Sequence, residues 1–111
     1  MDDAERRRNN RRNAFTAVSI NTPTRRGRFG MTRNISRTGM LIGTASRFQI
    51  GEQAWLTFRS DKRSVHNLRG RIVRLQVNDQ AETPIWHYLM AVRLSDPIPE
   101  ATIKTIETSS V

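Results

Sequence analysis

Hydrophobic residues recur at every second position in two segments of the second half of the chain. Residues 65–77 alternate apolar with charged or polar positions, and residues 86–94 place Tyr88, Met90, Val92 and Leu94 at every second position before two prolines. A period of two places alternate side chains on opposite faces of a β-strand, and the polar residues 78–84 between the segments are typical of a loop. The pattern therefore predicts a long antiparallel hairpin. Its expected inward residues are Leu68, Gly70 and Ile72, with Val73 and Leu75 as further candidates, and then Tyr88, Met90, Val92 and Leu94.

The first half of the chain carries shorter apolar runs, which are separated by proline, glycine, asparagine and serine. Each run contains β-branched or aromatic residues, which favour strands, and the separating residues favour turns. In the second run Phe29 and Met31 alternate with small or charged residues. This predicts a strand whose face with Phe29 and Met31 is apolar and whose other face is exposed to solvent. The runs are residues 14–20, 25–33, 40–42 and 54–58.

A short helix is predicted near the C-terminus. Residues 100–107 follow Pro97 and Pro99 and place Ile103 and Ile106 on one side, although three threonines in residues 102–108 keep the helix propensity low. Six or seven short strands with one small helix at the end predict an all-β fold, an antiparallel barrel, rather than an α/β layer. A chain of 111 residues can form one such core but not two.

Charge is distributed unevenly along the chain. The formal net charge is +9, of which residues 1–50 carry +8 and residues 51–111 carry +1. Most of the positive charge comes from arginine, whose planar fork of donors favours shaped recognition over diffuse attraction. A basic field of this kind indicates an anionic partner such as a nucleotide, a nucleic acid or a lipid head group.

Several functional classes receive no support from the composition. The chain has no cysteine, which excludes disulfides, thiolate nucleophiles and zinc-thiolate sites. His66 and His87 lack neighbours at metal-ligand spacing, and Ser36 lies in no nucleophile motif. The N-terminus is charged, and no apolar run approaches the roughly 20 residues of a membrane span. We therefore expect a soluble cytoplasmic protein without metal or cofactor, and not an enzyme.

An arginine-rich segment precedes the first predicted strand. Five arginines occupy the seven positions of residues 6–12, with no apolar side chain among them. Such a segment cannot bury enough surface to offset its own ordering entropy. We therefore expect residues 1–13 to form a flexible arm and residues 14–111 to form the barrel. Guanidinium groups bind phosphate bidentately and also match the O6/N7 edge of guanine, so a compact anion could order the arm.

A second polar motif, Asn-x-Ser-x-x-Gly, occupies residues 34–39. The arginine segment contains RRxxxR, and the two motifs in this order resemble the signature of the PilZ family, RRxxxR followed by [DN]xSxxG. Residues 68–74 and 88–94 are also similar to the later paired strands of that family. The resemblance covers most of the chain. It implies a six-stranded split barrel that binds the bacterial second messenger cyclic di-GMP.

The resemblance assigns the arginines of the first motif to the ligand. Arg8 and Arg12 would contact phosphate and guanine, and Arg7 would be the first arginine of the signature. An alternative register, Arg7 with Arg11, also satisfies RxxxR. A cation at the position of Arg7 goes in this family with a stacked pair of ligands, so the resemblance implies two cyclic di-GMP molecules per site.

The resemblance also assigns three residues of the second motif. Asn34 would hold a guanine edge, Ser36 would donate its hydroxyl to guanine or phosphate, and Gly39 would allow a positive φ or a close backbone approach. Asn34 stands where aspartate is commoner, and a neutral amide accepts hydrogen bonds less strongly than a carboxylate. In an alternative interpretation, Asn34 and Ser36 only cap a turn by bonding their own backbone.

The implied function is that of a single-domain receptor. Cyclic di-GMP would order the arm against the turn at residues 34–39, and the new surface would signal to an effector protein in trans. Two alternatives remain open. One is a small basic barrel that binds RNA or DNA, against which the strands are expected to expose no interleaved aromatic residues of the kind that stack bases. The other is a PilZ-like adaptor that does not bind the nucleotide.

Overall fold

The computed structural model describes residues 12–59, 65–79 and 85–108. Within these ranges seven strands are followed by one helix. The elements, in chain order, are β1 (Arg12–Asn13), β2 (Ala17–Asn21), β3 (Arg28–Ile35), β4 (Gly39–Thr44), β5 (Gln53–Arg59), β6 (Val65–Val77), β7 (Tyr88–Leu94) and α2 (Glu100–Thr108).

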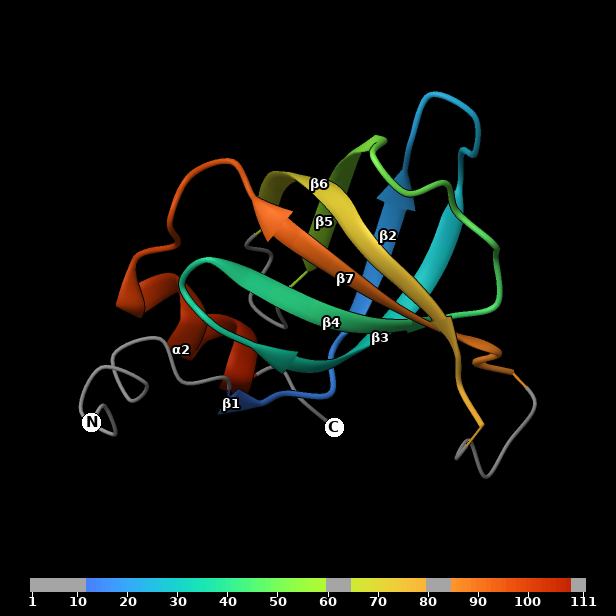
Figure 1. The fold of residues 1–111 in the computed structure, drawn as a ribbon. Coiled ribbons are helices and arrows are strands. Elements are labelled where there is room, and N and C mark those ends of the chain that lie inside the picture. The colour runs from blue at the N-terminus through green and yellow to red at the C-terminus, as the bar shows by residue number, and fades with distance from the viewer. Residues whose placement is uncertain (1–11, 60–64, 80–84, 109–111) are drawn as a thin grey trace, which may run out of the picture.

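The strands form one antiparallel sheet that closes on itself. Their order is β1-β3-β2-β5-β6-β7-β4, and a further pairing between β3 and β4 joins the two sides. Strands β2 to β7 therefore make a closed six-stranded barrel, with β4 and β7 in front of β2 and β5 in Figure 1. β1 lies outside this ring and pairs only with β3. The antiparallel barrel with a short C-terminal helix, expected from the sequence, is confirmed.

The barrel interior is apolar, and α2 contributes to it. Ile103 and Ile106 of the helix are both almost fully buried, as predicted. The hydroxyl of Thr16, which precedes β2, donates to the carbonyl of Ile106 at 3.0 Å and joins the helix to the barrel wall. In the described ranges, no helix has the length and apolarity that crossing a bilayer requires. The core cluster consists of Ala14, Val18, Ile20, Ile35, Met40, Ile42, Phe48, Ala54, Leu56, Phe58, Ile72, Met90, Val92, Leu94, Ile98, Ile103 and Ile106.

The predicted hairpin of the second half is confirmed as β6 and β7. The two strands pair antiparallel from Gly70 opposite Leu94 to Val77 opposite Tyr88. The register shifts between Ile72 and Arg74, which makes Val73 the extra residue of a β-bulge. Val73 is consequently exposed, and its candidacy for the inward face is wrong.

β3 faces the opposite way from the prediction. Its inward residues include Gly30 and Thr32, whereas Phe29 is 66 % exposed and Met31 is only half-buried. A side chain at position 30 does not fit, because a Cβ there would lie 2.7 Å from the carbonyl oxygen of Gly43. Thr32 is tolerated inside because its hydroxyl donates to the carbonyl of Ala14 and accepts from the amide of Thr16.

Phe29 on β3 and Trp55 on β5 lie on the outer surface of the barrel, where they are 66 % and 44 % exposed. Phe48 and Phe58, by contrast, are buried. The exposed rings on β3 and β5 differ from the expectation that the strands expose no interleaved aromatic residues of the kind that stack bases.

Candidate functional site

β1 brings the two sequence motifs together. Arg12, the last arginine of RRxxxR, pairs with Ile35, and Asn13 pairs with Asn34. Neighbouring strands lie about 4.8 Å apart, so the backbone that carries Arg12 runs beside the backbone that carries Asn34. Arg7 and Arg8 lie outside the described residues, as does the expected flexible arm apart from the two residues of β1.

A β-bulge turns Asn34 away from the core. In a regular strand Asn34 would point inward with Gly30 and Thr32, because side chains alternate. The register between β3 and β4 shifts between Thr32 and Asn34, and the consecutive residues Arg33 and Asn34 both avoid the interior. Ile35 then occupies the core. One extra residue thus places the half-buried side chain of Asn34 on the outer surface, and bulges are over-represented at such functional positions.

Ser36 holds the turn that follows β3. Its side chain is 3 % exposed. The hydroxyl accepts hydrogen bonds from the amides of Thr38 at 3.3 Å and Gly39 at 3.2 Å, and donates to the carbonyl of Gly39 at 3.2 Å. Its single hydrogen is therefore directed at the turn. The capping role left open by the sequence is present in the structure; contact with a ligand stays a prediction.

Gly39 is required for a close approach of two strands. Its φ is not among the positive values, which occur at Gly27 and Gly51 in the described residues. A Cβ at position 39 would lie 2.7 Å from the carbonyl oxygen of Val92 on β7. Of the two roles considered for this glycine, the structure shows the close backbone approach.

A shallow groove lies beside Gly39 on the outer surface. It is lined by Thr38, Gly39, Val73, Ala91 and Arg93, among others, with a volume of about 500 Å³, which falls in the usual range of ligand sites. The groove exists because glycine and alanine occupy outward positions on β4 and β7. It adjoins the turn that Ser36 holds, so the second motif forms one of its walls.

The register extends this groove into a larger basic surface. Asn34 lies opposite Leu41, Leu41 opposite Ala91, and Ala91 opposite Arg74. This row crosses three strand spacings, roughly 14 Å. A second row runs from Gly39 to Arg93 and on to Arg71. We call this surface the basic face and define it by Asn34, Gly39, Arg71, Arg74 and Arg93.

The charges of the basic face are not balanced within the sheet. Arg71 and Arg93 are direct cross-strand partners, an arrangement that is unfavourable without a counter-ion. One of the guanidinium donors of Arg71 already has a partner within the protein, because its Nη1 donates to the carbonyl of Gly51 at 2.5 Å. None of the seven strands contains an aspartate or a glutamate. The face is therefore suited to an anion.

Sequence reasoning missed part of this surface. Arg71 and Arg74 are absent from the inward residues predicted for the hairpin but were not connected with the motif residues, and Arg93 was not considered as a site residue. The alternating pattern predicted the pairing of β6 with β7 but not that of β4 with β7, so only the register places Arg93 beside Gly39. The exposure of Val73 was missed because the bulge in β6 cannot be recognised from the alternation of residues.

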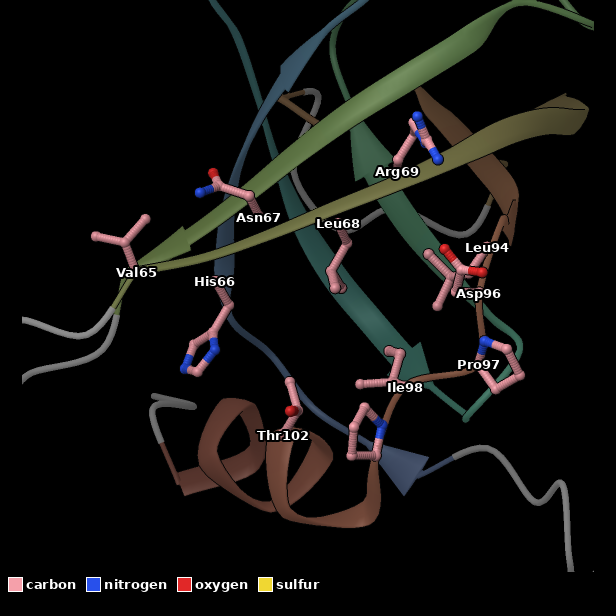
Figure 2. Close-up of a pocket in the computed structure, with 11 residues that line it drawn as sticks. Val65, His66, Asn67, Leu68, Arg69, Leu94, Asp96, Pro97, Ile98 and Thr102 are labelled. Carbon is pink, nitrogen blue, oxygen red and sulfur yellow. The ribbon is translucent and has the colours of Figure 1, made fainter.

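A second groove lies between β6 and the segment that leads into α2 (Figure 2). Its walls include Leu68, Arg69, Asp96 and Thr102, and the ring of His66 points toward the helix. The Nε2 atom of His66 is buried and has no hydrogen-bond partner among the described residues. This groove contains none of the residues assigned from the motifs.

The fold and the basic face define a small closed β-barrel with an arginine-rich outer surface. The family model for the PilZ domain matches residues 5–110, so the chain belongs to the PilZ domain family. PilZ domains are known as cyclic di-GMP receptors, and they generally serve as binding or adaptor domains rather than as enzymes.

A solved structure supports the same fold. The chain is similar to the Bacillus subtilis inhibitor of motility (MotI/DgrA), with a TM-score of 0.63 and 17 % sequence identity. The similarity covers 89 % of this chain and 47 % of that one, so the chain spans about half the length of its structural relative. At this identity the likeness concerns the fold alone. No curated protein sequence matches the chain.

Proposed function

We propose that this protein is a cytoplasmic cyclic di-GMP receptor that acts as an adaptor toward an effector protein. Residues 1–13 act as the ligand-binding arm, and residues 14–111 as the barrel that receives the ligand. The observation that carries the proposal is the pairing of β1 with β3, because it sets Arg12 next to Asn34 at the border of a face rich in arginine.

The chemistry of the ligand suits this surface. Cyclic di-GMP is a compact dianion with two guanine bases, so it offers phosphate oxygens, purine acceptor edges and aromatic faces. Arginine can bind all three, by bidentate hydrogen bonds or by stacking of the guanidinium plane. Arg7, Arg8 and Arg12 would approach from the arm, and Arg93 and Arg74 from the barrel.

The expected ligand stoichiometry rests on Arg7, because a cation at this position goes in the family with a stacked pair of ligands. Two stacked cyclic di-GMP molecules carry four phosphates, and the arginines of the arm and the basic face together can neutralise such a load. We therefore expect a stoichiometry of two.

Isothermal titration of the protein with cyclic di-GMP, with GTP as control, tests the proposal. Saturable binding with about two ligands per chain is expected. Arg12→Ala should abolish this binding with little change in melting temperature, whereas Arg11→Ala should retain it, which fixes the register of RxxxR. If the folded wild-type protein gives neither heat nor a thermal shift, the receptor function fails and the nucleotide-independent adaptor takes its place.

A further inference from the structure

The outer surface of β2, β5 and the adjoining halves of β3 and β6 differs in character from the basic face. In the ring of strands β2 and β5 lie across the barrel from β4 and β7, as Figure 1 shows. Its outward side chains combine two exposed aromatic rings with aliphatic, short polar and arginine side chains. We call this surface the aromatic face and define it by Ala17, Phe29, Met31, Trp55, Arg59 and Arg69.

The register shows that the two aromatic residues flank a single strand. Phe29 lies opposite Ser19 on β2, and Trp55 lies opposite Asn21 on the same strand. Small side chains at Ala17 and Ser19 leave a hollow of about 260 Å³ between Phe29 and Arg59. The hollow is thus bordered by the ring of Phe29 and by Arg59, whereas Trp55 lines a neighbouring hollow.

The charged side chains on the four strands of this face are all arginines. Arg59 and Arg69 are exposed, and Arg26 lies with Trp55 beside a neighbouring hollow. The four strands that build the face contain no carboxylate. Aromatic residues, methionine and arginine are the residue types that are enriched in protein interfaces.

The composition of the aromatic face favours one kind of binding partner over the others. A second copy of the chain is disfavoured, because each copy carries a net charge of +9 and arginine would meet arginine. A nucleic acid would stack its bases on aromatic rings along a basic groove, whereas the pair Ala17 and Met31 beside Phe29 adds aliphatic surface that does not stack bases. An acidic protein segment with apolar side chains can contact the aromatic and aliphatic side chains as well as the arginines.

We infer that the aromatic face docks the effector protein through a segment in which apolar side chains are flanked by aspartate or glutamate. The inference rests on the adaptor function proposed above, since an adaptor needs such a surface. β3 connects the two functions physically, because the same strand carries Asn34 at the basic face and Phe29 and Met31 at the aromatic face.

Selection from a random 12-residue peptide phage library against the folded, nucleotide-free protein tests the inference. Recovered peptides should combine aromatic or aliphatic residues with aspartate and glutamate. Titration of one such synthetic peptide should shift the indole resonance of Trp55 in a ¹⁵N–¹H correlation spectrum. Phe29→Ser and Arg59→Glu should each weaken binding of this peptide by about tenfold or more, as expected for central interface residues.

Two matched control variants distinguish an effect of the aromatic face from a general effect of surface charge or hydrophobicity. Val77→Ser removes a side chain of similar exposure, 63 %, from the part of β6 that pairs with β7. Lys104→Glu reverses an exposed charge on α2. Both variants should bind the peptide within about twofold of the wild type. All four variants should remain folded, because the substituted side chains are exposed.

Three results would overturn the inference. The first is a selection that yields no peptides, or peptides without acidic enrichment. The second is a peptide that binds Phe29→Ser as tightly as the wild type. The third is tight binding of a fluorescein-labelled 12-residue oligothymidylate that Phe29→Ser weakens while the peptide is unaffected, because it would assign the face to nucleic acid. Titration of Phe29→Ser with cyclic di-GMP tests nucleotide binding independently of peptide binding, because the substitution changes no residue of the basic face.

Discussion

Arg71 on β6 and Arg93 on β7 lie directly opposite each other, and Gly39 is the partner of Arg93 on its other side. Like charges in such positions destabilise a sheet by a fraction of a kcal/mol, about 0.2–1 kcal/mol. Gly39 offers no side chain that could separate or screen them. The pair is therefore a local cost to the folded protein that a bound anion can remove.

Arg93→Ala should weaken cyclic di-GMP binding without destabilising the free protein. A hydrogen bond to a charged group contributes about 1.5–3 kcal/mol, so the dissociation constant should rise by roughly tenfold to a hundredfold. Loss of the like-charge pair should leave the melting temperature equal or slightly higher at low salt. Calorimetry and thermal unfolding measure the two effects. Arg47→Ala, at an exposed position between β4 and β5, serves as control, and equal affinity in both variants would remove Arg93 from the site.

Ser36→Ala should destabilise the turn after β3. The substitution leaves the amides of Thr38 and Gly39 without their acceptor, and the loss of such bonds costs about 1 kcal/mol. Urea unfolding should therefore show a lower midpoint, with weaker ligand binding as a consequence. Ser95→Ala, at an exposed position, should unfold like the wild type. A Ser36→Ala variant of full stability that still loses the ligand would instead indicate direct contact.

Gly39→Ala should be more damaging than Gly43→Ala on the same strand. The added methyl group at position 39 meets the backbone oxygen of Val92 at 2.7 Å, whereas at position 43 the nearest atom is the Cβ of Trp86 at 3.3 Å. Backbone cannot move aside as easily as a side chain, so overpacking should cost about 1–3 kcal/mol at Gly39 and less at Gly43. Comparable free energies of unfolding for the two variants would contradict this account.

Met90→Asp should unfold the barrel, and Leu89→Asp should not. Met90 is fully buried, whereas its neighbour Leu89 is half-buried and points outward. An unpaired buried carboxylate costs several kcal/mol, and the lost burial of methionine adds about 1.5–3 kcal/mol. Together these approach the total stability of a small domain, about 5–15 kcal/mol. Far-ultraviolet circular dichroism of both variants checks the prediction, and a folded Met90→Asp protein would show that β7 faces the other way.

The sequence predicted the regular parts of the barrel and missed its irregularities. Met90, Val92 and Leu94 were placed correctly because β7 contains no bulge between them, so every second residue faces the core. Val73 was misplaced because one extra residue in β6 ends the alternation. In β3 the inward positions are Gly30 and Thr32, which are small or polar, so hydrophobicity pointed to the wrong face.

The candidate site likewise contains residues that the sequence identified and residues that only the structure shows. The motif identified the region around Asn34, Ser36 and Gly39, and the structure supplies a specific local reason for the serine and the glycine. The participation of Arg93 and Arg74 depends on which strands are neighbours, and nothing in local composition encodes that. A pattern along one strand predicts a face, but a surface that crosses four strands requires the register.

The two residues of β1 also determine whether the barrel has a free edge. β2 covers residues 28–31 of β3, and β1 covers Asn34 and Ile35 on the same side. When β1 is detached, the peptide groups of β3 at this end lose their partner, and an unpaired strand edge can accept an extended segment from another molecule. Occupancy of this edge by the chain's own arm therefore protects the protein against strand exchange between copies.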